Sequence, residues 1–257
     1  MVTGGATAGV TSVAIVGATG RMGQLATRLI ESSDDLRVHV GLGSSDPIER
    51  IEGADLVLDL TVPAVSPEVV GAALDRGIPV LVGTSGWTSE RIATLARRMT
   101  ELPELGVVIV PNFSLGSVLA TMAATMLAPY FTSIEIVEAH HAGKVDSPSG
   151  TAIRTAELIG AARKDAGPVD APHADQRARG QQVASVSIHS LRMNGLLAQQ
   201  DVIFGGVGET VRISHETFSG ESYAAGLLLG LRAAPTARGV VVGLDKLLGL
   251  SGPSSNG

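Results

Sequence analysis

Apolar runs alternate with amphipathic segments over the first 113 residues of the chain. Strands are predicted at 12–16, 36–42, 54–60, 79–82 and 106–110, and helices at 21–32, 68–76 and 89–99. The predicted strands are almost continuously apolar, which is typical of a sheet that is buried on both faces. Strands that alternate with helices form parallel βαβ units, so this part of the chain is predicted to be an α/β domain.

The pattern changes from residue 114 onward. Helices are predicted at 116–127 and 151–164, a polar loop at 167–182, and strands at 133–140, 184–191, 200–204 and 209–215. The strand at 133–140 alternates apolar and polar positions, so one of its faces is expected to be buried. This order predicts an α+β unit with a mainly four-stranded sheet and helices on one face. A helix at 223–233 and the segment 240–248 close the chain.

The composition narrows the class of protein. With 257 residues, 44% hydrophobic and 3% aromatic, the chain suits one large or two small domains with an aliphatic core. The formal net charge of −6 argues against nucleic acid or an anionic membrane as a partner held by bulk charge. The absence of cysteine excludes disulfides, thiolate metal sites and cysteine nucleophiles, and fits a cytoplasmic protein. The apolar runs are too short to cross a bilayer, and residues 1–11 and 251–257 are expected to be disordered tails.

A glycine-rich turn links the first predicted strand to the first predicted helix. Residues 17–23 follow the spacing G-x-x-G-x-x-G, which lets the backbone turn sharply and approach a pyrophosphate. The N-terminus of the next helix then offers N–H groups and the positive end of its dipole. A ligand-free turn is the alternative, but the place of the motif in the first βα unit favours dinucleotide binding. The candidate contacts are Gly17, Ala18, Thr19, Gly20, Arg21 and Met22.

Two further small-residue loops follow predicted parallel strands. Gly83-Thr84-Ser85-Gly86 follows the strand at 79–82, and Pro111-Asn112-Phe113 follows the strand at 106–110. The carboxyl ends of parallel strands share one edge of the sheet, where α/β proteins bind ligands. Each loop alone is compatible with a structural turn, but three at one edge favour a dinucleotide site. The candidate contacts here are Gly83, Thr84, Ser85, Val110, Pro111, Asn112 and Phe113.

The densest chemistry lies in residues 138–152. His140 and His141 end a predicted strand and are expected to point to opposite sides, with Lys144 just beyond them. Ser149 is a natural N-cap, so the N–H groups of Gly150 and Thr151 can hold a carboxylate. A packed histidine and a solvated lysine are the alternative. Two histidines, a lysine and an anion-ready helix start within so short a segment favour a functional site.

The remaining candidate chemistry is sparse. Adjacent histidines do not normally bind one ion together, and no carboxylate or thiol has the usual helical offset, so no metal site is expected. The other four histidines lack comparable neighbours and are expected to be surface or strand residues: His39, His173, His189 and His215.

The segment Glu138–Ala152 follows the pattern E-x-H-H-x-x-K-x-D-x-P-S-G-T-A, and with it the chain resembles the 4-hydroxy-tetrahydrodipicolinate reductase family, also called dihydrodipicolinate reductase. The resemblance extends over Ser12–Leu250. Its supporting matches are the glycine turn, Asp59-Leu60-Thr61-Val62-Pro63, Gly83-Thr84-Ser85-Gly86, and Pro111-Asn112-Phe113-Ser114 with Gly116.

The resemblance implies a domain plan and an assembly. A Rossmann-like dinucleotide domain is implied at 12–113 and a substrate-binding and tetramerisation domain at 114–222, with 223–250 returning to the first domain. The family also implies a homotetramer built through the sheets of the substrate domain.

The implied reaction reduces a ring formed from pyruvate and aspartate semialdehyde to tetrahydrodipicolinate, with NADH or NADPH delivering a hydride to C4. His140 is implied to be the general acid, and Lys144 a second proton donor and charge stabiliser. The implied contacts to the two substrate carboxylates are His141, Lys144, Gly150 and Thr151, at the helix start that Ser149 caps. Such chemistry is reasonable, because hydride addition leaves electron density that a nearby histidine or ammonium group can protonate.

The chain departs from the family pattern at three places. The acidic residue expected after the second strand is missing from Gly41-Leu42-Gly43-Ser44-Ser45, the second threonine of G-T-T-G is Ser85, and an arginine expected before the final helix is Gly220. Without that acid we expect NADPH to be used at least as well as NADH, with weak discrimination as the alternative. Two other functions stay open: an aspartate or homoserine dehydrogenase of the same fold, and a nucleotide-binding sensor without turnover.

Overall fold

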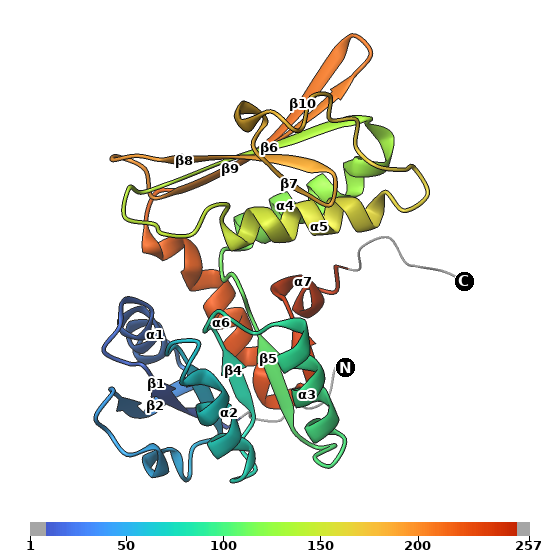
Figure 1. Cartoon of the computed structure of the whole chain (residues 1–257). Helices are drawn as coiled ribbons and strands as arrows, with labels where there is room; N and C mark the ends of the chain where they lie inside the picture. Colours follow the sequence, from blue (N-terminus) through green and yellow to red (C-terminus); the bar gives the residue numbers. More distant parts are fainter. Residues whose placement is uncertain (1–8, 251–257) are drawn as a thin grey trace, which may run out of the picture. The chain divides into compact units, whose positions relative to one another are not determined.

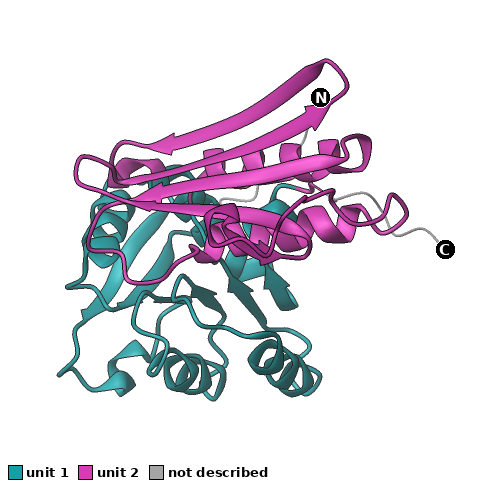
Figure 2. Ribbon diagram, turned by 45° about the horizontal axis from the view of Figure 1, so that its top comes forward, with its two compact units in different colours: residues 1–113, 223–248 teal, residues 114–222, 249–257 magenta. Residues whose placement is uncertain are grey.

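A computed structural model describes residues 9–250. The chain forms two compact units, shown in Figure 2: the part up to Phe113 together with Tyr223–Leu248, and Ser114–Ser222. Of the expected terminal tails, residues 1–8 and 251–257 lie outside the described residues, and the first strand begins at Thr11. In the described part of the chain, no helix is long and apolar enough to span a membrane.

The first unit contains a parallel sheet of six strands (Figure 1). The strand order is β11-β5-β4-β3-β1-β2. The strands are β1 (Thr11–Val16), β2 (Leu36–Leu42), β3 (Leu56–Asp59), β4 (Val80–Val82), β5 (Gly106–Ile109) and β11 (Gly239–Val242). The helices are α1 (Arg21–Glu31), α2 (Ser66–Leu74), α3 (Ser89–Met99), α6 (Ala224–Ala233) and α7 (Leu244–Leu247).

Helices cover both faces of this sheet, as its apolar strands predict. On one face, Val57, Val80 and Val107 pack in a common core with residues of α2 and α3. On the other face, Gly230 of α6 lies directly against Leu81, and α6 also contacts α1. Burying a fully apolar strand on both sides contributes about 25 cal/mol for each Å² removed from water, which favours this layered arrangement.

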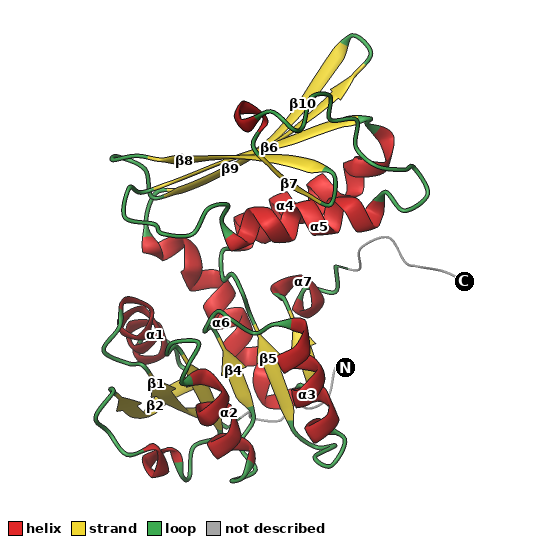
Figure 3. Cartoon of the chain, viewed as in Figure 1, coloured by secondary structure: helices red, strands yellow, loops and turns green. Residues whose placement is uncertain are grey.

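The second unit contains a five-stranded mixed sheet with two helices packed on one face (Figure 3). Its order is β10-β9-β6-β8-β7, in which only β6 and β8 pair in parallel. The strands are β6 (Ser133–His140), β7 (Gln181–Val183), β8 (Val186–Arg192), β9 (Ala198–Gly206) and β10 (Glu209–Thr217), and the helices are α4 (Leu115–Leu127) and α5 (Gly150–Ala162). Ile134, Ile136 and Phe204 pack with α5 residues such as Ala156 in the core beneath the sheet.

These elements confirm the predicted α/β class and the Rossmann-like parallel sheet, with one addition to the second sheet. The fifth strand β7 lies in the segment expected to be a polar loop. It joins β8 through Ala184 and Ser185, which both have positive φ. Tight hairpins usually mark such positions with Asn or Gly, so this turn has no recognisable sequence signal. The strand itself is polar and too short to show a period.

Candidate active site

The glycine turn of the first unit has the geometry of a phosphate cradle. Gly17 has a φ of 90°, and a Cβ atom there would lie 2.4 Å from the carbonyl oxygen of Leu60. A Cβ atom at Gly23 would lie 2.2 Å from the Gly17 carbonyl oxygen, so both positions require glycine. Gly20 caps α1, and a Cβ atom there would meet the protein no closer than 3.4 Å. The fold itself does not need Gly20 to be bare, whereas a pyrophosphate approaching the backbone does.

The strand order places this turn where α/β sheets bind ligands. Strand β2 lies on one side of β1, whereas the next strands along the chain, β3 and β4, lie on the other side. The strand order therefore reverses between β1 and β3. The loops after β1, β4 and β5 follow the carboxyl ends of parallel strands of this sheet. Together with the first turn of α1, they hold all the predicted cofactor contacts. Open α/β sheets bind nucleotides in the crevice outside these ends. The residues present therefore fit a dinucleotide.

A buried carboxylate joins the loop after β4 to the loop after β3. Asp59, at the end of β3, is fully buried and its Oδ1 accepts hydrogen bonds from Thr61 Oγ1 at 2.6 Å and Thr84 Oγ1 at 3.0 Å. Its Oδ2 accepts from Ser66 Oγ. A buried carboxylate needs such partners, and here they fix the loops after β3 and β4 to each other. The hydroxyl of Thr84, a predicted cofactor contact, thus also has a structural role.

The end of β2 differs from a usual ribose site. Gly43 carries no acid, and its backbone N–H instead donates to Asp46 Oδ2 at 2.8 Å. Asp46 Oδ1 accepts from Arg50 at 2.7 Å in a partly exposed ion pair. A Cβ atom at Gly43 would lie 3.6 Å from Asp46 Oδ2, so a carboxylate from three residues downstream lies beside the position that the missing acid would occupy.

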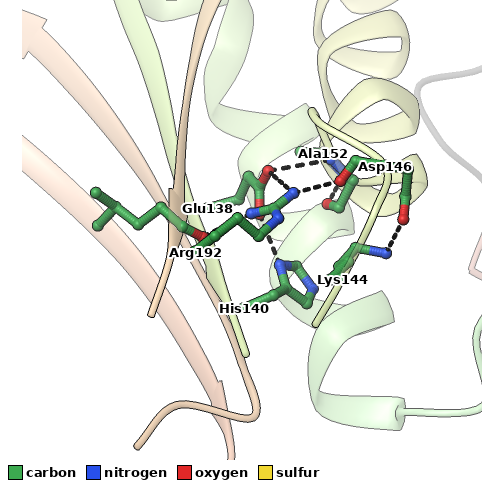
Figure 4. A network of polar contacts seen from close by, with 8 residues as sticks. Glu138, His140, Lys144, Asp146, Ala152 and Arg192 are labelled. Carbon is green, nitrogen blue, oxygen red and sulfur yellow. Dashed lines mark hydrogen bonds and ion pairs between the residues drawn. The ribbon is translucent and has the colours of Figure 1, made fainter. Parts of the chain in front are cut away.

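In the second unit, His140 pairs with a buried glutamate on its own strand. Glu138 is fully buried, and His140 Nδ1 donates to its Oε2 at 2.6 Å. Arg192, from β8, donates to both oxygens of Glu138 at 2.9 Å (Figure 4). Burial would raise the pKa of Glu138, but hydrogen bonds from Arg192, Ser190 and His140 outweigh it and lower this pKa. Glu138 is therefore an anion, and the proton in the hydrogen bond between His140 and Glu138 is on Nδ1 of His140.

The surroundings of His140 favour its neutral form. Its side chain is 17% exposed, and burial lowers the pKa of its imidazole. The hydrogen bond and charge of Glu138 oppose this shift, while the charges of Lys144 and Arg192 add to it, and the net pKa lies below the ordinary histidine value. Because Nδ1 is occupied by Glu138, Nε2 is the atom through which His140 exchanges a proton.

Lys144 lies in the loop after β6, close to His140 (Figure 4). Its Nζ donates to Asp146 Oδ1 at 2.7 Å, and the Lys144 side chain is 22% exposed. The hydrogen bond from Lys144 lowers the pKa of Asp146 and outweighs the opposing effect of burial. The ammonium group is thus held near His140 by a carboxylate that is itself exposed. An incoming carboxylate can compete for it at low cost.

The start of α5 is capped as the sequence predicts. Ser149 is the N-cap, and its Oγ accepts from the N–H of Ala152 at 3.2 Å. Its own N–H donates to Glu138 Oε1 at 3.1 Å. No acidic residue lies in the first turn of α5, and a Cβ atom at Gly150 would have no neighbour within 4 Å. The first turn keeps its positive dipole end and its backbone donors at Gly150 and Thr151 for an anion.

The structure places the other predicted residues less uniformly. His141 follows the end of β6 and is exposed, whereas His140 is half-buried, so the two neighbours have different surroundings. Three of the four other histidines have partners: His39 contacts the Glu52 carbonyl, His189 contacts Glu135, and His215 contacts Ser114. Within residues 9–250 no group of histidine and acidic side chains is arranged to hold a metal ion.

The sequence did not identify Arg192 as a site residue, nor the structural role of Glu138 in binding His140, Arg192 and the N-cap of α5. Arg192 lies on another strand, 54 residues from Glu138, and nothing in its local sequence signals a site. Glu138 belongs to the recognised segment, but only the β6–β8 pairing shows that its partner is an arginine. The sequence gives one indication: Glu138, a carboxylate on a predicted strand, needs a hydrogen-bonding partner. Many residues could be that partner, so the sequence alone does not select Arg192.

Comparisons with known proteins cover the two halves of the chain. A family model described as "Dihydrodipicolinate reductase, N-terminus" matches residues 11–113. A second, described as "Dihydrodipicolinate reductase, C-terminus", matches residues 114–248.

Curated relatives and a solved structure agree with these models. The chain is 60% identical to a 4-hydroxy-tetrahydrodipicolinate reductase of Clavibacter michiganensis subsp. michiganensis, over 94% of this chain and 87% of that protein. It is 45% identical to the protein of that name from Streptomyces griseus subsp. griseus, over 93% and 98%. The structure of dipicolinate-bound dihydrodipicolinate reductase from Paenisporosarcina sp. TG-14 is similar with a TM-score of 0.79, 28% identity and coverage of 92% and 99%.

Proposed function

The chain belongs to the dihydrodipicolinate reductase family, and we propose that residues 138–151 carry out the proton chemistry and carboxylate binding of its reaction. The reaction is the reduction of 4-hydroxy-tetrahydrodipicolinate to tetrahydrodipicolinate on the path to lysine, in which the 4-hydroxyl group leaves as water and the cofactor hydride takes its place at C4. The family favours this function over an aspartate or homoserine dehydrogenase and over a sensor without turnover. The observation that carries the residue assignment is the Glu138–His140 pair beside the capped start of α5.

When bound, the nicotinamide dinucleotide supplies the hydride. His140 then holds the proton that neutralises the electron density left on the ring, and it delivers this proton through Nε2. The negative charge of a bound dicarboxylate raises the pKa of His140 from its lowered value in the free protein. Lys144 contributes positive charge to the same region and serves as a second proton donor.

The substrate carboxylates are expected at the start of α5, with Lys144 and His141 as further contacts. Pyridine-2,6-dicarboxylate, a planar dicarboxylate, should therefore inhibit competitively against the substrate. Gly150→Pro tests the helix start directly, because proline suits the first helical position but removes one N–H. Ser149 already has the extended backbone that a following proline requires, with φ −64° and ψ 148°.

We expect Gly150→Pro to weaken inhibition about tenfold or more, the effect of losing one hydrogen bond to a charged group. Gly150→Ala is the matched control, because it keeps the N–H and its Cβ atom meets nothing within 4 Å. Inhibition constants and thermal unfolding of the three proteins are to be compared. Equal inhibition of all three, or a co-crystal with the compound bound elsewhere, would refute this carboxylate pocket.

We infer that NADPH is used at least as well as NADH. The acid that normally binds the ribose hydroxyls and repels a 2′-phosphate is absent from residues 41–45, and the nearby carboxylate of Asp46 is already bound by the Gly43 N–H and by Arg50. Ser44, Ser45 and Arg21 can donate to a phosphate at this end of β2. The values of kcat/KM for both cofactors at matched ionic strength test this inference.

Gly43→Asp should restore the preference for NADH, and Gly43→Ala is its control. Position 43 has room for a side chain, since its Cβ atom would lie 3.4 Å from the nearest neighbour, a Thr19 methyl group. If the unmodified protein prefers NADH about tenfold, or about 1.4 kcal/mol, some other group reads the ribose, and Asp46 is the first candidate.

We propose that the protein is a cytoplasmic homotetramer. The absence of cysteine fits a reducing cytoplasm. The sheet of the second unit is the candidate assembly surface, because α4 and α5 pack on one face of it. Strand alternation places Val137, Leu191 and Ile203 on the other face. Sedimentation should give a tetramer of the 26.2 kDa chain, and a monomer at micromolar concentration would contradict the proposal.

The activity itself is tested by oxidation of NADH or NADPH with the freshly formed condensation product of pyruvate and aspartate semialdehyde. Purified protein should oxidise the cofactor only when both precursors have been condensed. Oxidation with aspartate semialdehyde alone would instead favour the homoserine dehydrogenase alternative. Cofactor binding without any oxidation would favour the sensor.

A further inference from the structure

We propose that Glu138, held by Arg192, is the positioning residue that fixes the imidazole of His140 and the start of α5 in one geometry. The inference rests on the proposed function, since it takes His140 as the proton donor and the start of α5 as the carboxylate site. It assigns to Glu138 and Arg192 a role in the reaction without any contact to the substrate.

The two oxygens of Glu138 divide the contacts. Oε2 accepts from His140 Nδ1 at 2.6 Å and from Arg192 Nη1 at 2.9 Å. Oε1 accepts from the N–H of Ser149 at 3.1 Å and from Arg192 Nη2 at 2.9 Å (Figure 4). One rigid carboxylate therefore connects the residue that carries the proton to the N-cap of the helix that binds the carboxylate. A small rotation of Glu138 would displace both.

Arg192 restrains this carboxylate and the loop beside it. Its guanidinium group binds both oxygens of Glu138 in a fork, which fixes the plane of the carboxylate. Nη2 of Arg192 also donates to the carbonyl oxygen of Asp146 at 2.6 Å. Asp146 in turn holds Lys144. Arg192 thus links His140, Lys144 and the start of α5, which lie on three different segments of the chain.

The charge of Glu138 sets the tautomer of His140. The Glu138 side chain is completely buried, so an anion persists there only because Arg192 and the other donors surround it. An anionic Oε2 accepts the Nδ1 proton and leaves Nε2 for the substrate. The charged groups that influence His140 are Glu138 from β6, Lys144 from the following loop and Arg192 from β8. Of these, Glu138 alone raises its pKa.

The same sheet contains a matched cluster that serves as a control. Glu135, three residues earlier on β6, is also bound by an arginine and a histidine, Arg179 and His189. Strand alternation puts Glu135 and Glu138 on opposite faces of the sheet. Glu135→Gln therefore removes a Glu–Arg–His cluster of the same composition without touching His140. Its oligomeric state is to be checked, because Glu135 lies on the face proposed for assembly.

The experiment compares Glu138→Gln, Arg192→Lys and Glu135→Gln with the unmodified protein. The readouts are kcat, KM, the pH profile of kcat/KM, and the pKa of His140 from its ring NMR signals with and without pyridine-2,6-dicarboxylate. Glu138→Gln should lower kcat about 10- to 100-fold, by analogy with the loss found when the hydrogen-bonding partner of a metal-bound histidine is removed. It should also move the His140 titration to lower pH, since both contributions that raise this pKa come from Glu138. KM should change less than kcat.

Arg192→Lys should reproduce part of both effects, because lysine keeps the charge but loses the fork. Arg192→Lys keeps Glu138 intact, so this variant still tests the proposal if Glu138→Gln does not fold. Glu135→Gln should leave the pH profile and the His140 titration unchanged. The proposal is overturned if Glu138→Gln and Arg192→Lys titrate like the unmodified protein, or if Glu135→Gln shows equal losses. The NMR titration needs no turnover, so it also separates this proposal from a failure of the proposed function.

Discussion

Purified His140→Gln is expected to lose turnover by about a hundredfold to ten-thousandfold, with little change in KM. The proton that His140 delivers is needed as the ring accepts the hydride, so the contribution of His140 belongs to the transition state. Glutamine is similar in size and can still donate to Glu138 Oε2, which keeps the buried carboxylate partnered. It has no proton to transfer from the position of Nε2.

Initial rates over a range of pH test this expectation. In the unmodified protein, kcat/KM should fall as pH rises through the lowered pKa of His140, because the protonated form is the active one. His140→Gln should lose that limb of the profile. His189→Gln is the matched control, since His189 also pairs with a glutamate of β6. Unmodified turnover in His140→Gln would remove His140 from the mechanism.

Lys144→Ala is expected to weaken both substrate binding and turnover, each by about tenfold to a hundredfold, as for a lost hydrogen bond to a charged group. The ammonium group attracts a substrate carboxylate before the reaction and stabilises charge during it. Its loss leaves Asp146 without its cation, but the Asp146 side chain is 58% exposed, so the cost to folding is small.

Apparent affinity for pyridine-2,6-dicarboxylate and kcat of Lys144→Ala separate the two contributions. Lys164→Ala, which removes an exposed lysine beyond the end of α5, is the control for a change in net charge. Lys144→Arg should recover part of the binding but less of the rate, because the guanidinium group keeps its charge but is a poor proton donor. An unchanged affinity and rate in Lys144→Ala would make Lys144 an ordinary surface charge.

Much of the fold follows from local patterns. The strands β2 and β6 and the helix α3 begin and end where their apolar periods predict. Helix α2 begins two residues before the predicted start, because Pro67 is tolerated in a first turn, where no intrahelical N–H bond is lost. The segment 240–248 divides into β11 and α7 at Gly243, whose positive φ of 97° ends the strand and turns the backbone before the helix. Strand β7 lacks both a period and a turn signal, so no local rule could find it.

The candidate site likewise contains residues that the local sequence predicts and residues that it does not. His140, Lys144 and the cap at Ser149 are close in sequence, so spacing and capping rules bring them together before any fold is known. Arg192 reaches Glu138 only through the parallel pairing of β6 with β8. Similarly, the partners of Asp59 come from loops after two different strands. Contacts of this kind depend on which strands pair in the sheet. The residues that support His140 and the cofactor loops can therefore be identified only from the structure.

Transfer of deuterium tests the central claim most directly. The protein is given the condensation product of pyruvate and aspartate semialdehyde together with NADPH or NADH that carries two deuterium atoms at C4 of the nicotinamide, and the product is analysed by NMR and mass spectrometry. We expect tetrahydrodipicolinate with deuterium at C4 of the ring, one atom for each cofactor oxidised, and the same transfer about a hundredfold to ten-thousandfold more slowly in His140→Gln. Deuterium at another carbon, or oxidation of the cofactor without transfer to the product, would contradict this claim.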